Sequence, residues 1–394
     1  MVYGEGDAMT QVVEASTDQV AAFHALLLRM SGRLPDELTT AARRWLAEGE
    51  FVEIAQAVLF SALAARLPMT EGDLSLLSAT LVEAGEDTEA LADIERTDDD
   101  PLPPYGVAPV SPDELDEHGS AVPYSIDLTV PYDGPGAADD VDRAAVAAAE
   151  AQRNDGVAVA ALWRAWRFPA IDAQWPPPRR IYLLQSDDEA AVPALAVHLQ
   201  DALEAVGETD PQVEVFVDPD ELPAYQRNTL GFSTLLWTAT PPIRPLVARV
   251  YDMFDAESGP GFASDHPRLD GDERDQILEY LADGTPLLIT PTLSPDVVDP
   301  AAGEVVPTGF FTDGRWIWAD AAVYYLRTYG LAPDPDLVEA IRASHYLPPE
   351  VDAVALHRAL SVLYAPVDEG RSTQGTAELP ADAPADRKET GDNL

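Results

Sequence analysis

The chain of 394 residues contains no cysteine and only one lysine, Lys388. Without cysteine it can form no disulfide, thiolate metal site, iron–sulfur cluster or cysteine nucleophile. It also lacks a run of about 18 apolar residues, the length that a transmembrane helix needs. Its first ten residues have neither the basic segment nor the apolar segment that is typical of a secretory signal. We therefore expect a cytoplasmic protein that does not insert into membranes.

Positive charge is scarce: 24 Lys and Arg residues stand against 70 Asp and Glu residues, which gives a formal net charge of −46. Such an excess repels nucleic acids and anionic lipids and favours a protein partner with a basic surface. The same acidity also fits general solvation of the whole surface, and both interpretations stay open. Apolar residues nevertheless make up 46% of the chain, which is enough for folded cores and excludes an acidic disordered polymer.

The pattern predicts an α+β protein with two domains. Residues 10–96 form the first, an all-α module, because apolar residues recur there every three or four positions. Residues 97–123 are rich in Pro and Asp and predict an exposed linker. Residues 124–365 form an α/β domain with a mixed sheet and a core at 179–345. The polar tail, 366–394, is expected to be disordered.

A β–α–β unit is predicted at the start of that core. Residues 180–184 (RIYLL) and 213–217 (VEVFV) are short apolar runs typical of buried strands, and residues 190–206 between them fit a helix. Strand, helix and strand at these lengths indicate a parallel pair. Two further helices are predicted, an Ala-rich one at 139–166 and another at 222–238.

Catalytic and cofactor motifs are absent from the sequence. It has neither a P-loop nor a strand followed by G-x-G-x-x-G, and it lacks H-E-x-x-H, paired histidines at helical spacing, and G-x-S-x-G. We therefore predict no cofactor and no metal, and favour a protein that is not an enzyme. The alternative is a hydrolase-like enzyme for small molecules, in which His266 is the acid/base and Asp265 and Arg268 line the pocket.

The most distinctive segment is 310–318 (FFTDGRWIW), where Asp-Gly predicts a tight hairpin turn. Trp316 and Trp318 are two residues apart and share one face of the second strand. Two interpretations stay open: these aromatic residues form a core, or they anchor a partner, with charged residues at the rim. The candidate partner-binding residues are Asp313, Arg315, Trp316, Trp318, Tyr324 and Tyr325.

Segments 265–269 (DHPRL), 280–286 (YLADGTP), 297–300 (VVDP) and the TDGRWIW run give residues 180–344 a family resemblance. This part of the chain resembles a group of uncharacterised actinobacterial proteins of mycobacterial type. Some of these are encoded near genes for type VII secretion and necrotizing NAD-glycohydrolase toxins. The resemblance implies an accessory, chaperone or immunity-like protein that occludes a secreted toxin or a type VII substrate. A scaffold with one partner for each domain is a further alternative.

Overall fold

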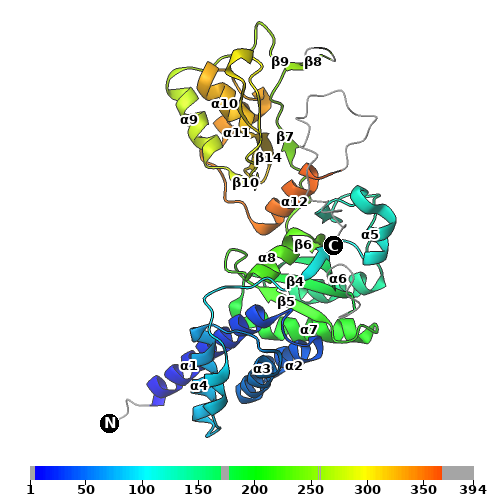
Figure 1. Ribbon diagram of the computed structural model, residues 1–394, viewed down its shortest axis with the longest axis vertical. Coiled ribbons are helices and arrows are strands. Elements are labelled where there is room, and N and C mark those ends of the chain that lie inside the picture. The colour runs from blue at the N-terminus through cyan, green and yellow to red at the C-terminus, as the bar shows by residue number, and fades with distance from the viewer. Residues whose placement is uncertain (1–4, 170–176, 256, 258, 366–394) are drawn as a thin grey trace, which may run out of the picture. The chain divides into compact units, whose positions relative to one another are not determined.

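The computed structural model describes residues 5–169, 177–255, 257 and 259–365, with side chains from Thr17 onward. The predicted disordered tail lies outside the described residues. The chain divides into two compact units (Figure 1). Among the described residues, unit 1 takes those up to 244 and 353–365, and unit 2 takes those from 245 to 352. The chain is an α+β protein with a helical N-terminal region followed by sheets, as the sequence predicts.

Four helices open unit 1 and share one apolar core. The apolar residues that recur every three or four positions in the first helix face this core, where Phe23, Leu27 and Met30 are buried. The last of the four begins where Thr70 Oγ1 accepts a hydrogen bond from the Asp73 amide at 3.1 Å. The helices are α1 (Glu5–Met30), α2 (Asp36–Glu48), α3 (Phe51–Ala65) and α4 (Glu71–Glu83).

A mixed sheet follows in unit 1. Its strand order is β2-β6-β3-β4-β5, and β1 pairs with the C-terminal part of β3. The predicted β–α–β unit is confirmed: β4 and β5 are parallel, and α7 connects them. Strand β3 runs antiparallel to β4 and to β6. The strands are β1 (Tyr105–Ala108), β2 (Ile126–Asp127), β3 (Val159–Pro169), β4 (Arg179–Ser186), β5 (Gln212–Phe216) and β6 (Thr234–Thr238).

Helices cover both faces of this sheet, so its strands are apolar on both sides. On β4, Tyr182 and Leu184 pack with α6 and α7, while Ile181 and Leu183 pack on the opposite face with residues before α8 and in α12. This alternation is the period of two that a strand imposes. The covering helices are α6 (Asp140–Asn154), α7 (Val192–Ala205), α8 (Ala224–Gly231) and α12 (Ala353–Leu363).

Buried polar contacts join the first helices to the sheet. Arg43 of α2 pairs with Glu214 of β5 at 2.6 Å, and Glu214 also accepts hydrogen bonds from Gln226 at 2.9 Å and Ser31 at 3.2 Å. All four side chains are buried. The helical region and the sheet are thus parts of the same unit, whereas the sequence prediction placed them in separate domains.

Three local predictions about unit 1 are wrong. The predicted helix 139–166 ends at Asn154, and Gly156 adopts φ +94° before β3 begins. The predicted helix 222–238 comprises the short α8 and then β6. The predicted linker, 97–123, contains the edge strand β1 and buried Val110, followed by α5 (Pro112–His118). Short 3-10 turns occur at Glu89–Asp93, Gly119–Ala121 and Glu189–Ala191.

Unit 2 is a smaller fold in which α9, α10 and α11 pack with a four-stranded sheet (Figure 1). The predicted hairpin is confirmed, because β13 and β14 are antiparallel neighbours joined at the Asp-Gly turn.

Two separate two-stranded ribbons complete the described part of the unit. The sheet comprises β10 (Thr285–Leu288), β13 (Phe310–Thr312), β14 (Trp316–Ala319) and β7 (Leu246–Val247). The helices are α9 (Gly271–Ala282), α10 (Asp320–Tyr329) and α11 (Pro335–Ala343). The ribbons are β8 (Met253–Asp255) with β9 (Gly259–Gly261), and β11 (Leu293–Pro295) with β12 (Glu304–Pro307); a 3-10 turn lies at Pro300–Ala302.

Within the described ranges, no helix combines the length and the apolar character needed to cross a membrane.

Candidate functional site

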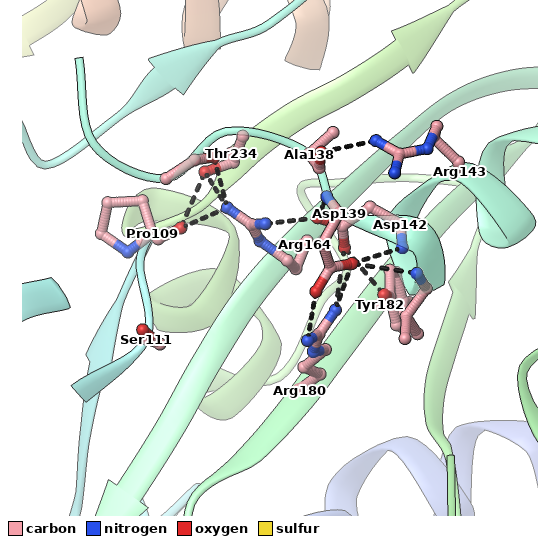
Figure 2. A network of polar contacts seen from close by, with 12 residues as sticks. Pro109, Ser111, Ala138, Asp139, Asp142, Arg143, Arg164, Arg180, Tyr182 and Thr234 are labelled. Atoms are coloured by element: carbon pink, nitrogen blue, oxygen red, sulfur yellow. Dashed lines mark hydrogen bonds and ion pairs between the residues drawn. The ribbon is translucent and has the colours of Figure 1, made fainter. Parts of the chain in front are cut away.

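Arg164 lies at the centre of a buried polar network in unit 1 (Figure 2). Its Nη1 donates to Asp142, at the start of α6. Its Nη2 donates to the carbonyl oxygens of Pro109 at 2.9 Å and Gly136 at 3.0 Å, and to Thr234 Oγ1 at 3.2 Å. One guanidinium therefore joins β3, β6, α6 and two connecting segments.

The same network extends to β4 (Figure 2). Tyr182 donates its hydroxyl proton to Asp142 at 2.8 Å, and burial together with that carboxylate raises the pKa of Tyr182. Arg180 donates two hydrogen bonds to Asp139, at 2.8 and 2.5 Å. Partial burial opposes ionisation of Asp139, but the bonds from Arg180 and from two backbone amides outweigh it and lower its pKa to about 2. Because both carboxylates are bound by neighbouring side chains, we interpret this network as one that holds α6, β3 and β4 together.

His266 in unit 2 lies between two acceptors. Its Nδ1 is 2.8 Å from Asp252 Oδ2, and its Nε2 is 2.9 Å from the carbonyl oxygen of Ala332. The carboxylate beside it is therefore Asp252 and not the predicted Asp265, whose side chain is exposed. Arg268 is also exposed and donates to the carbonyl oxygen of Tyr329 at 2.5 Å. His266 holds together two segments, and neither ring nitrogen points to open space.

Asp296, directly after β11, is a buried carboxylate of unit 2 that sequence reasoning did not single out. It is 1% exposed and accepts hydrogen bonds from the hydroxyls of Tyr324 at 2.9 Å and Tyr329 at 2.5 Å. The amides of Val298 and Asp299 donate to it at 2.8 and 3.2 Å. Burial opposes ionisation, but these four donors outweigh it, and the pKa of Asp296 is lowered.

Tyr325 lies inside a cluster of aromatic rings beside this carboxylate. Ring centroids of Phe262 and Tyr324 are 4.9 and 5.3 Å from its own, and those of Tyr251 and Tyr329 are 5.9 and 6.2 Å away. Its hydroxyl accepts a hydrogen bond from the Val297 amide at 3.2 Å. Tyr325 is buried, so the prediction that it is a partner-binding anchor is corrected: it is a core residue.

The predicted anchors on β14 are core residues as well. Trp318 has no exposed surface, and Trp316 is buried in the same cluster. Asp313, predicted at the rim, is also buried and builds the turn: its Oδ1 accepts from the amides of Arg315 at 2.8 Å and Trp316 at 2.6 Å. Its Oδ2 accepts from the Tyr280 hydroxyl at 2.6 Å. The structure thus supports the core interpretation of this segment, and only exposed Arg315 and half-buried Tyr324 remain candidates for a partner.

The ribbon of β11 and β12 exposes apolar side chains that sequence reasoning missed. Leu293 is 44% exposed, Val298 in the connecting loop 41%, and Val305 37%, whereas Val306 is buried. Val305 is the extra residue where the ladder shifts register between Ser294 and Pro295. No signal in the sequence indicated this bulge, which interrupts the regular alternation of faces along the strand. Leu293, Val298 and Val305 are called the hairpin surface below.

Comparison of the chain with protein-family models, with curated proteins and with solved structures gives no match. Among the residues that the structure describes, no group of three or more His, Cys, Asp or Glu side chains is placed to hold a metal ion. The hairpin surface is therefore assessed from its own geometry and charge.

Proposed function

We propose that this protein binds another protein and acts by occlusion, with unit 2 covering a basic surface of the partner. The observation that carries the proposal is the hairpin surface, where Leu293 and Val305 of the ribbon and Val298 of its connecting loop are exposed. Exposed apolar side chains close together in the sequence fit a protein-binding site, because contact with a partner removes them from water.

Charge supports a basic partner. Residues 245–352 contain 20 Asp and Glu residues and only six Arg residues, with no Lys. Opposite charge speeds the encounter of two proteins and orients them, while apolar contacts stabilise the bound state. The family resemblance of residues 180–344 suggests the class of partner, a secreted toxin or a type VII substrate.

The experiment is affinity capture from the native host with the full chain as bait, followed by identification of the retained protein and measurement of its Kd with purified components. Binding is measured at about 150 and about 500 mM salt, because electrostatic attraction weakens as the Debye length shrinks. The bait is compared with the double variant Leu293→Asp/Val305→Asp. The control is Phe60→Asp, which places one such charge on an exposed apolar residue of α3.

We expect one stoichiometric partner that stays bound at the higher salt, and a loss of affinity of at least about tenfold in the double variant. The Phe60→Asp control should bind like the wild type. Equal binding by the double variant would contradict the assignment of this surface, and retention of basic proteins only at low salt would contradict a dedicated partner.

A further inference from the structure

Unit 1 contains a cavity of about 300 Å³ where four segments meet. These are the end of α1, the residues around the start of α4, the loop 97–101 and the first turn of α8. The volume is at the lower end of the range for small-molecule sites. Its charged lining residues include Arg29, Arg33, Arg227, Asp98, Asp99 and Glu221.

Arg33 is a half-buried cation in this lining that lacks a carboxylate partner. Its Nη2 donates to the carbonyl oxygen of Pro68 at 2.5 Å. In the described part of the chain no carboxylate oxygen lies within ion-pair distance of it, whereas neighbouring Arg29 is paired with Asp73. Burial lowers the pKa of Arg33 even though Asp73 and Asp100 attract its charge from further away. A ligand anion would supply the missing partner.

Arg227 on α8 adds a second cation to the same cavity, and its side chain is exposed. The loop opposite is held by Asp100, which accepts a hydrogen bond from the Ala224 amide at 2.6 Å where α8 begins. The carboxylate of Asp100 is therefore already hydrogen-bonded to a backbone amide at the start of α8. Asp98 and Asp99 belong to the same loop and are exposed, so they are available to a positively charged group.

We propose that this cavity binds a basic α-amino acid, with Arg33 and Arg227 holding its carboxylate and Asp98, Asp99 and Glu221 facing its positive groups. The lining contains cations and a larger number of carboxylates, which disfavours a nucleotide or another polyanion. A ligand that carries one carboxylate and a cationic side chain matches both kinds of group. The proposal is independent of the hairpin surface, which belongs to unit 2.

The test is isothermal titration of the full chain with three probes. L-Arginine carries both groups, agmatine lacks the carboxylate, and L-glutamate lacks the cationic side chain. We expect L-arginine to bind at least about tenfold more tightly than either of the others. Agmatine binding as tightly as L-arginine would overturn the role of the two arginines, and no heat of binding with L-arginine up to about 10 mM would overturn the site.

Variants of the residues that line the cavity test which of them contact the bound amino acid. Arg33→Gln and Arg227→Gln should each weaken L-arginine binding at least about tenfold, and Asp98→Asn/Asp99→Asn should weaken it while bringing the L-arginine and L-glutamate affinities closer together. Arg143→Gln, an exposed arginine of α6, is the matched control and should bind like the wild type. Because Arg227 is exposed, its variant reports on binding even if Arg33→Gln disturbs folding. Wild-type affinity in Arg227→Gln, or a loss in Arg143→Gln as large as in the cavity variants, would overturn the proposal.

Discussion

The two units stabilise buried carboxylates in different ways. In unit 1, Asp142 and Glu214 are paired with buried arginines, Arg164 and Arg43. In unit 2, buried Asp296 has no ion pair among the described residues and is held by two tyrosine hydroxyls and two amides. Asp313 is likewise held by a tyrosine and two amides. A third buried acid of unit 2, Asp334, pairs with Arg249, whose side chain is exposed.

The difference shows two ways of keeping a carboxylate ionised inside an acidic protein. An arginine cancels the charge, but it must itself be taken out of water, so removing either partner leaves an uncompensated buried charge. Neutral donors spread the charge over several hydrogen bonds, so losing one of them is a smaller change. The chain has 24 basic residues against 70 acidic ones, and its buried arginines lie where α2, α6 and α12 join the large sheet.

The largest expected effect comes from breaking an arginine pair in unit 1. Arg43→Met leaves Glu214 buried without its cation, and we expect a loss of about 3–5 kcal/mol in the free energy of unfolding. Denaturant unfolding followed by far-UV circular dichroism measures it. The double variant Arg43→Met/Glu214→Met removes both charges and should be considerably more stable than Arg43→Met. A double variant at least as unstable as the single one would show that the pair is not the source of the effect.

A smaller loss is expected in unit 2. Asp296→Ala removes the acceptor of four hydrogen bonds, but the side chains of Tyr324 and Tyr329 are only half buried and can turn to water. We expect about 2–3 kcal/mol, and less for Asp296→Asn, which keeps one acceptor oxygen. Hydrogen exchange resolved by peptide should show faster exchange in 245–352 and unchanged exchange in the β4–β5 region. A loss as large as that of Arg43→Met would contradict the comparison.

The charge of Arg43 also affects the pKa of a histidine in unit 1. Burial, with the nearby charge of Arg43 as a second cause, lowers the pKa of His24 from 6.5 to about 3. Between these values the unfolded chain binds a proton that the folded chain does not, so stability falls as pH falls from 6.5 toward 3. His24→Asn should remove about 1–2 kcal/mol of that dependence at pH 5. Parallel pH–stability curves for the two proteins would show that His24 titrates normally.

The smallest effect concerns Asp139, whose carboxylate is 46% exposed. Its lowered pKa, about 2, gives stability that is present above about pH 4 and is lost as pH falls to 2. Because solvent screens this exposed pair, Asp139→Asn should cost less than about 1 kcal/mol at pH 7, and less still at high salt. Asn keeps an acceptor for the α6 amides, so the variant isolates the charge. A loss independent of both pH and salt would point to the cap instead.

Local patterns in the sequence predicted much of the fold. The β–α–β unit was found because its strands are short runs of apolar residues separated by an amphipathic helix. The helix predicted at 139–166 was wrong because alanine-containing sequence resumes after the polar run 150–156 (EAQRNDG), and the prediction carried the helix across that run. Gly156, which takes a positive φ, was the available stop signal.

The candidate site was less predictable. The segment around Trp316 and Trp318 was found, but its burial depends on α9, α10 and α11 packing against it, and no local pattern distinguishes a core aromatic residue from an exposed one. Asp296 is one of 70 acidic residues, and its role arises only when α10 brings two tyrosines to it. Contacts between distant segments decide such roles, and a single sequence does not record them.

Helix α12 determines when unit 1 can be completed during synthesis of the chain. Its residues follow unit 2 in the sequence, yet His357 Nε2 donates to the carbonyl oxygen of Ile126 in β2 at 2.8 Å, and Arg358 pairs with Asp127 of the same strand. On the ribosome, all of 245–352 must be made before unit 1 receives its last helix. Unit 2 can therefore fold while unit 1 is still incomplete, and a chain that stops before residue 353 leaves the apolar sheet face around Trp163 without Ala353 and Val354.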